Sequence, residues 1–265
     1  MANPMQDTAI LQDRLPHLAW IDPRTRRLPG ILPVDGRDWL RQDEAYAPQM
    51  ALRDRLVDAQ PEVIHALLPE GRPAAGELYT AVLDWLGTAP GFARSADTIC
   101  RPDGVTVHLD PDQPLLTLGR LIQEDLCLME KNGEEYRLTG GILCFPASWT
   151  LQQKIGRPLT GIHDTVSIYD EDIARRVGRL FDAIRPEQPL WRMNYLTYDD
   201  FVLHQPRREG EKRPRPVDHG YIRSERQCLM RLPVTRAVVF TIHTYVVDAT
   251  TVSPGDLAAL RDAVH

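Results

Sequence analysis

The sequence predicts an α+β protein, with helices in the first third of the chain and antiparallel hairpins in the rest. Apolar residues recur at helical spacing up to about residue 86 and at strand spacing from about residue 105. Asn132-Gly133 lies between two apolar runs, which is the strongest short signal for a β-hairpin. An amphipathic segment at 170–184 interrupts the strands. We therefore expect a curved antiparallel sheet with N-terminal helices and one long crossing helix, and one sheet face available to a ligand.

The N-terminal third supplies the first helices. Residues 1–37 are rich in proline and form an irregular arm, which we expect to drape over a single domain spanning residues 1–265. Residues 38–59 have a mostly helical apolar spacing, although Pro48 could split that helix. Residues 78–86 predict a second, shorter helix.

The strands follow in hairpins. Thr106–His108 predicts a short strand, and Leu115–Arg120 is a second apolar piece in the same strand-like region. Residues 125–130 and 134–145 predict the hairpin about Asn132-Gly133. The other expected strands are 190–197, and 222–232 with 237–247 about a turn at 233–236. The helix at 170–184 has acidic residues at its start and Pro186 after its end, and Ser253-Pro254 begins a last helix.

The composition is that of an ordinary globular protein. The 265 residues are 43% hydrophobic and 26% charged, which allows a sizeable buried core. The net charge of −6 gives no support for binding nucleic acid or an anionic membrane. No apolar run reaches the roughly 18–20 residues needed to span a bilayer. The N-terminus lacks a basic stretch followed by an apolar one, so we expect a cytoplasmic protein.

The sequence lacks the motifs of several common catalytic and cofactor sites. The cysteines Cys100, Cys127, Cys144 and Cys228 are scattered, which favours reduced thiols and excludes a local iron–sulfur motif. No dinucleotide-binding, phosphate-loop, HExxH or GxSxG motif occurs. The eight histidines include no pair at i, i+4, so a zinc site would need ligands from distant positions.

His163 is the most suggestive single residue. It follows an apolar strand that breaks at Phe145-Pro146, a polar segment containing Trp149 and Lys154, and a Gly156-Arg157-Pro158 turn. One interpretation is a hydrogen-bonded structural histidine. The other is the ligand of a metal or haem in a core cavity, because a haem iron needs only one imidazole from the chain.

Two predicted strands carry paired polar residues. In one, Arg223 and Glu225 share a face, and Arg226 lies on the other. An arginine aimed at a cavity can clamp a carboxylate such as a haem propionate, or it can form a ladder with glutamate at a sheet edge. In the other, Arg192 and Asn194 share a face and could supply a cation and an amide to a ligand, or cap a loop.

Two further charged segments have two interpretations each. Gln123-Glu124-Asp125 precedes an apolar strand and is either a turn device or a group that orients a cationic amine. Residues 207–215 hold five Arg or Lys residues, and are either a solvated loop or a docking site for an acidic partner.

The chain resembles the α-subunit family of haem-dependent oxidative N-demethylases over most of its length, roughly Trp39 to Tyr245. The resemblance is carried by four runs: LCFPASWTLQQKIGRPLTGIHDTV (143–166), QEDL (123–126), RMNY (192–195) and RSERQCLMRLP (223–233). The chain departs from the family at Thr165-Val166-Ser167, where Pro-Val-Pro is frequent, and at Tyr195, where Trp is frequent. We expect these positions near the cavity, where they bear on the substrate more than on the haem.

The resemblance implies haem b in a PAS-like α+β fold, with His163 as the ligand of the iron. It implies O2 activation, hydroxylation of a methyl group on a small secondary amine such as dimethylamine, and release of formaldehyde. Electrons would come from partner subunits of the reductase or ferredoxin type, which carry flavin and an iron–sulfur cluster. The candidate cofactor-binding residues are His163, Arg223, Arg192, Asn194 and Lys154, and the candidate catalytic residues are Glu225, Arg226 and Glu124.

Two other functions fit the same residues. The chain could be a haem or small-ligand sensor that binds gas without turnover, or a scaffold subunit without a cofactor. An enzyme consumes O2 and releases formaldehyde, a sensor binds CO or O2 reversibly, and a scaffold purifies colourless. The size of the Arg, Glu and Gln set favours the enzyme.

Overall fold

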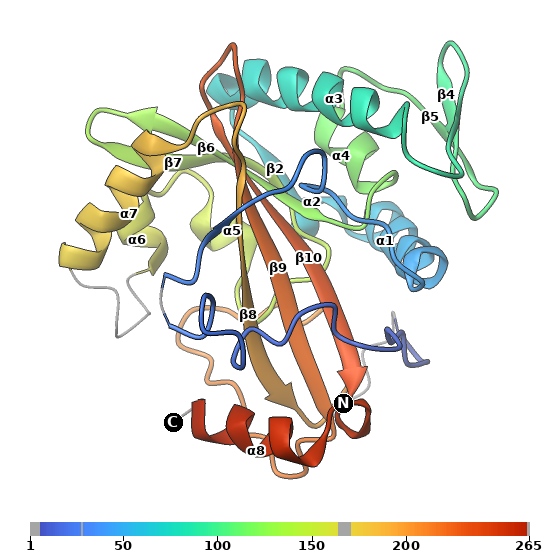
Figure 1. The fold of residues 1–265 in the computed structure, drawn as a ribbon. Helices are drawn as coiled ribbons and strands as arrows, with labels where there is room; N and C mark the ends of the chain where they lie inside the picture. The colour runs from blue at the N-terminus through green and yellow to red at the C-terminus, as the bar shows by residue number, and fades with distance from the viewer. Residues whose placement is uncertain (1–5, 28, 164–170, 264–265) are drawn as a thin grey trace.

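The computed structural model of the chain describes residues 6–27, 29–163 and 171–263. Its centre is a seven-stranded antiparallel sheet in the order β1-β8-β9-β10-β6-β7-β2 (Figure 1). The strands are β1 (Leu32–Pro33), β2 (His65–Leu67), β6 (Asp125–Asn132), β7 (Glu135–Ile142), β8 (Leu190–Tyr198), β9 (Tyr221–Arg231) and β10 (Val238–Asp248).

The remaining elements surround this sheet. A small sheet contains β3 (Ala93–Arg94), β4 (Thr98–Cys100) and β5 (Thr106–His108). The helices are α1 (Tyr46–Ala59), α2 (Pro61–Ile64), α3 (Arg72–Leu86), α4 (Pro114–Gly119), α5 (Leu151–Lys154), α6 (Leu159–His163), α7 (Glu171–Ala183) and α8 (Pro254–Ala263), with short 3-10 turns at Pro69–Gly71 and Ala249–Thr251. The antiparallel α+β class is confirmed, while the PAS-like description and the crossing role of α7 remain predictions.

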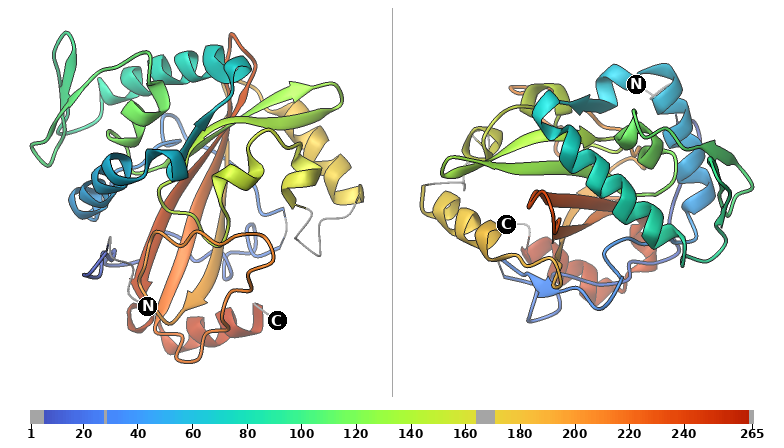
Figure 2. Two further views of the ribbon diagram at one scale, coloured as in Figure 1. Left: turned by 180° about the vertical axis from the view of Figure 1, so that it is seen from behind. Right: turned by 90° about the horizontal axis from the view of Figure 1, so that it is seen from above.

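The two faces of the sheet have different partners. The face that we call the α7 face packs against α5, α6 and α7, through a cluster that includes Leu151, Leu159, Phe181, Leu229, Phe240 and Ile242. The opposite face, the arm face, packs part of its area against the N-terminal arm, through a cluster that includes Leu15, Trp20, Met193, Ile222 and Tyr245. Figure 2 shows α5 and the segment 199–220 over the side opposite the arm. Because side chains alternate along a strand, neighbouring residues of β8, β9 and β10 belong to different environments.

Two predicted helices need new bounds, and one predicted strand-like segment is a helix. The first helix begins at Tyr46 and not at residue 38, and Pro48 lies in its first turn, where proline needs no intrahelical donor. The helix predicted at 78–86 begins earlier, at Arg72. The strand-like interpretation of Leu115–Arg120 is wrong, because residues 115–119 belong to the helix α4 and Arg120 caps its C-terminal end. That helix is buried on several sides, and a short apolar run then carries no period that distinguishes helix from strand.

The predicted hairpins and the late helix are confirmed. β6 and β7 are joined at Gly133, whose φ of 66° is the left-handed conformation that glycine adopts without strain. β9 and β10 pair over their whole length, from Tyr221 with Asp248 to Arg231 with Val238. α7 spans Glu171–Ala183, which is shorter than α3. Asp182 of α7 accepts hydrogen bonds from Lys131 and Tyr136, so this helix is fastened to the β6–β7 hairpin.

The strand predicted at 134–145 ends early, at Ile142. Beyond it, the backbone N–H groups of Cys144 and Phe145 donate to the carboxylate of Asp125, at 2.7 and 2.8 Å. Asp125 is also paired with Arg53 at 2.8 Å, and both side chains are buried. A buried side-chain pair therefore replaces the sheet ladder where the chain leaves β7.

The described residues 6–27 and 29–31 contain no helix or strand. They are nevertheless attached to the sheet, because the backbone N–H of Gln12 donates to the carbonyl of Val246 at 2.9 Å and Trp20 is buried in the arm-face cluster. Within the part of the chain that the structure describes, no helix is both long enough and apolar enough to cross a bilayer.

Candidate functional site

Four polar side chains from β8 and β9 meet on the α7 face. The strand register places Arg192 opposite Gln227 and Asn194 opposite Glu225. All four therefore belong to one side of the sheet, the side that also carries the apolar contacts to α5, α6 and α7. The same register confirms the predictions that Arg192 shares a face with Asn194 and that Arg223 shares a face with Glu225.

Glu225 is the centre of this group. Its carboxylate accepts from the Asn194 amide at 2.8 Å and from the Gln227 amide at 3.2 Å, both through Oε2. The other oxygen, Oε1, lies 3.5 Å from the Arg223 guanidinium. Glu225 is only 6% exposed. The structure therefore holds a buried carboxylate in a defined orientation, with one oxygen less fully engaged than the other.

Unpaired polar atoms lie around Glu225. Among the described residues, Nε of Arg192, Nε of Arg223 and Oγ1 of Thr244 are buried without a hydrogen-bond partner. Thr244 lies directly across from Glu225 on β10. Burial lowers the pKa of the Arg192 guanidinium, against the opposing charge of Glu225. Because buried polar atoms are rarely left unpaired, these atoms are suited to a ligand that supplies the missing acceptors.

The other nitrogens of Arg223 are already used. Nη2 donates to the carbonyl of Phe145 at 2.6 Å, and Nη1 donates to the carbonyl of Leu203 at 2.9 Å. Arg223 thus fastens both the break after β7 and the start of the 199–220 segment to β9. Of its nitrogens, Nε is the one that the described residues leave to a ligand.

Lys154 holds α6 in place. Its ammonium donates to the carbonyl of Ile162 at 2.6 Å and to Glu209 at 2.6 Å, and the residue is 4% exposed. The charge that was predicted to bind a cofactor is therefore paired within the chain. Through these bonds Lys154 positions the residue next to His163.

His163 is the last residue of α6, and its side chain lies outside the described part of the structure. Gly156, with a φ of 78°, turns the chain into α6. Four apolar side chains of the α7-face cluster, just before α5 and on α6 and α7, are only partly buried: Trp149, Ile162, Val177 and Leu180. Partly buried apolar side chains over the same sheet face as a buried arginine nitrogen without a described partner fit the needs of haem, which has an apolar ring and anionic propionates.

Arg226 and Glu124 do not join this group. Arg226 lies on the arm face, where it donates to the backbone carbonyl of Asp38 at 2.5 Å and lies 5.3 Å from the Trp191 ring. Glu124 accepts from the backbone of Arg41 at 2.6 Å and contacts His243 at 3.0 Å. Both side chains attach the segment before α1 to the sheet. Of the three predicted catalytic residues, Glu225 alone lies on the α7 face.

Sequence reasoning missed the buried charge network around His243. Its ring nitrogens lie 3.0 Å from Glu124 and 3.0 Å from Asp43. Burial opposes the charged imidazole, but the hydrogen bonds to Asp43 and Glu124 prevail and raise the pKa of His243 to about 9. The partners lie 119 and 200 residues away, so no local spacing signals the contact.

Tyr195 also lies away from the candidate site. It is next to Asn194 on β8 but faces the arm, where its ring packs against Trp20 with centroids 5.1 Å apart. Alternation along the strand turns this side chain to the face opposite Glu225, so the expectation that Tyr195 lies near the cavity stays a prediction. Thr165, Val166 and Ser167 lie outside the described residues.

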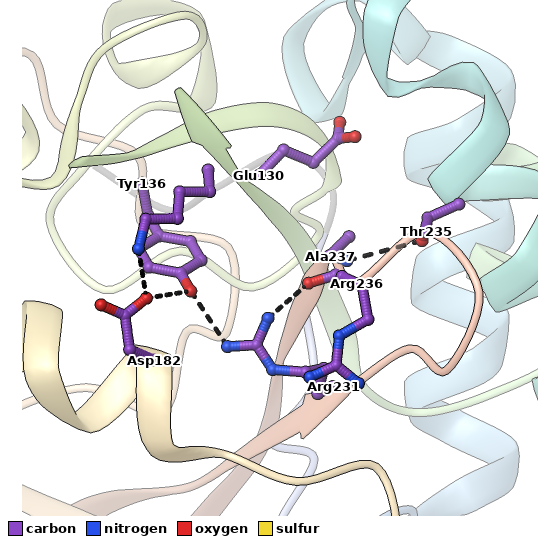
Figure 3. A pocket seen from close by; sticks show the side chains of 8 residues that line it. Glu130, Tyr136, Asp182, Arg231, Thr235, Arg236 and Ala237 are labelled. Atoms are coloured by element: carbon purple, nitrogen blue, oxygen red, sulfur yellow. Dashed lines mark hydrogen bonds and ion pairs between the residues drawn. The ribbon is translucent and has the colours of Figure 1, made fainter. Parts of the chain in front are cut away.

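A separate pocket of about 310 Å³ lies between the β6–β7 hairpin, the end of α7 and the β9–β10 turn (Figure 3). Its central side chain, Arg231, donates to Tyr136 at 3.0 Å and to the carbonyls of Arg236 and Ile184 at 2.6 and 2.7 Å. Its polar groups largely satisfy one another, so it is not the candidate site. In residues 6–27, 29–163 and 171–263 no cluster of three or more His, Cys, Asp or Glu side chains could hold a metal ion.

The described residues thus form an antiparallel α+β protein with a buried carboxylate and buried arginine nitrogens that lack a partner on one face of its sheet. The chain belongs to the family described as haem-dependent oxidative N-demethylase, alpha subunit-like, whose profile matches residues 30–264. The family resemblance predicted from the four sequence runs is thereby confirmed. No individual curated protein matches the chain.

Proposed function

We propose that this chain is the haem-binding subunit of an oxidative N-demethylase that acts on a small secondary amine such as dimethylamine. The observation that carries the proposal is the Glu225 carboxylate, buried on the α7 face and oriented by Asn194 and Gln227. An N-methyl ammonium ion needs an oriented anion to bind it, and the amine becomes oxidisable only after losing its proton. Glu225 can meet both needs through Oε1.

Haem b is proposed to lie between α6, α7 and this face, with His163 as the ligand of the iron and Arg192 toward a propionate. When bound, the haem supplies the activation of O2. The chain supplies orientation: Lys154 holds the end of α6 through Ile162, and the α5–α7 cluster excludes water from one side. Arg226 and Glu124 are assigned no part at the reacting atoms, because both lie on the arm face.

The proposed reaction is the monooxygenation of an N-methyl group. One oxygen atom of O2 enters a C–H bond of the N-methyl group, and the other leaves as water with two electrons and two protons. The resulting N-hydroxymethyl amine breaks its C–N bond, the hydroxyl proton passes to nitrogen, and formaldehyde and the shorter amine separate. Glu225 can hold the proton that the ammonium gave up.

Partner subunits are proposed to supply the electrons, through flavin and an iron–sulfur cluster. Membership in an alpha subunit-like family supports the existence of partners. We also propose a cytoplasmic location, which is supported by the four cysteines because none of them forms a disulfide.

The test is haem reconstitution of the purified chain, followed by turnover. A Soret band should form, and His163→Ala should shift it. With dimethylamine, O2 and a chemical reductant, the wild type should release formaldehyde and Glu225→Gln should release at least about a hundredfold less, as expected for loss of acid–base catalysis. Reversible CO binding without formaldehyde would indicate a sensor, and absence of any Soret band would contradict the haem assignment.

A further inference from the structure

A second polar group lies on the same face as Glu225, toward the end of β8. We call it the arginine cluster: Tyr198, Arg207, Arg213 and Arg223. Tyr198 and Arg223 are diagonal neighbours, because Leu196 pairs with Arg223 and Tyr198 pairs with Tyr221. The Arg213 guanidinium lies 3.6 Å from the centre of the Tyr198 ring. Arg207 and Arg213 come from the segment 199–220, and the loop and the sheet therefore build the cluster together.

The arginine cluster contains three buried donors without a partner among the described residues: the Tyr198 hydroxyl, Nε of Arg207 and Nε of Arg223. Tyr198 is 4% exposed and Arg223 is 3% exposed, so water does not replace the missing bonds freely. Native proteins leave few buried polar atoms unpaired. Three such donors within one group point to an acceptor-rich ligand.

The charges of the cluster lead to the same conclusion. Burial lowers the pKa of Arg213, and the neighbouring charges of Arg207 and Arg223 lower it further, while Tyr198 and Asp200 act against them. One carboxylate oxygen of Asp200, Oδ1, already accepts hydrogen bonds from the Gln205 amide and the Val202 backbone N–H. Glu225 contacts Arg223 alone among the three arginines. Uncompensated buried charge is costly, so an anion bound here removes a penalty.

The structure separates the five basic residues of the segment 207–215 into two sets. Arg207 and Arg213 are partly buried, whereas Arg208, Lys212 and Arg215 are exposed. The exposed residues fit the interpretation as a solvated loop. The partly buried residues, Arg207 and Arg213, belong to the arginine cluster.

We propose that the arginine cluster binds a carboxylate carried by the amine substrate, which makes the substrate class N-methyl amino acids. The inference rests on the proposed function. An N-methyl amino acid places its ammonium and carboxylate on a single carbon. Glu225 and Arg223 lie 3.5 Å apart and present the two complementary charges side by side. A haem propionate has the same carboxylate chemistry, and Arg192, on the same face, remains for it.

Binding is measured by calorimetry on the haem-loaded chain, without reductant, using N-methylglycine, dimethylamine and acetate. N-methylglycine should bind at least about tenfold more tightly than either fragment-like ligand. Tyr198→Phe and Arg207→Gln should each weaken N-methylglycine about tenfold, the factor for one lost charge-assisted hydrogen bond. Neither change should alter dimethylamine binding. Tyr198→Phe removes a hydroxyl that has no partner among the described residues, so folding should be unaffected.

Tyr195→Phe is the matched control, because it makes the same change on the same strand but on the arm face. It should leave all three affinities unchanged. Equal binding of N-methylglycine and dimethylamine, or no effect of the two variants, would overturn the proposal. The proposal would also be overturned if the two variants weakened the binding of haem but not of haem dimethyl ester, because the cluster would then bind a propionate. Tight N-methylglycine binding, but no formaldehyde release once O2 and a chemical reductant are added, would instead count against the proposed function alone.

Discussion

Asn194 and Glu225 lie directly opposite each other on β8 and β9 and are joined by two hydrogen bonds through the Asn194 side chain. The Asn194 amide donates to Oε2 of Glu225 at 2.8 Å, and its carbonyl oxygen accepts from the backbone N–H of Glu225 at 2.9 Å. One side chain thus fixes both the strand and the carboxylate that it carries. The candidate site is therefore oriented by a cross-strand pair that uses both functions of a single amide.

Asn194→Ala should lower stability and misorient Glu225. The change removes two hydrogen bonds and leaves a buried carboxylate oxygen with one weaker partner, which should cost about 1–3 kcal/mol. Urea unfolding measures this loss. Asn132→Ala, at the exposed last residue of β6, is the control and should stay within about 0.5 kcal/mol of the wild type. If the two variants are equally stable, the cross-strand pair contributes nothing to folding.

The stability of the protein should fall at alkaline pH because of His243. Asp43 and Glu124 raise the pKa of His243 to about 9, whereas an unfolded histidine titrates near 6.5. The raised pKa adds stability that is complete below about pH 6.5 and is lost as pH rises through about 9, with a size on the order of 3 kcal/mol. Unfolding free energies at pH 6.5, 8 and 9.5 measure the loss. His243→Gln should be less stable at pH 6.5 and should show a flatter profile.

Lys154→Met should weaken haem binding more than Arg157→Met does. Both cations contact Glu209, at 2.6 and 2.9 Å, but Lys154 also holds the carbonyl of Ile162, the residue before His163. Arg157 has a side chain that is 40% exposed, and an exposed pair contributes little. Haem titration followed by the Soret band compares the two. Equal affinities would show that Lys154 does not position His163 for the iron.

Breaking the pair between Arg53 and Asp125 should destabilise the protein strongly. Both side chains are buried, and Asp125 also accepts from the backbone after β7. Arg53→Met leaves a buried carboxylate without its cation, which should cost about 3–5 kcal/mol. Arg53→Met combined with Asp125→Asn should recover part of this loss. Thermal unfolding of the single and double variants tests whether the penalty comes from the unpaired charge.

The hairpins could be predicted because their signals are local. Asn132-Gly133 marks the β6–β7 turn, and alternating apolar residues mark β9 and β10. The same alternation placed Arg223 with Glu225 on one face and Arg226 on the other. The short helix α4 was missed because tertiary burial on several sides removes the helical period from its sequence.

By itself, the sequence determined the α+β class, the main hairpins, the family and which polar residues within β8 and within β9 share a face, because all of these depend on local spacing or on short motifs. Only the tertiary structure decided which face met the helices and which met the arm. That choice separated Glu225 from Arg226 and Glu124, turned Tyr195 away, and placed His243 between two distant carboxylates. The physical reason is that strand alternation specifies two sides but not their partners, which depend on long-range packing of segments far apart in the chain.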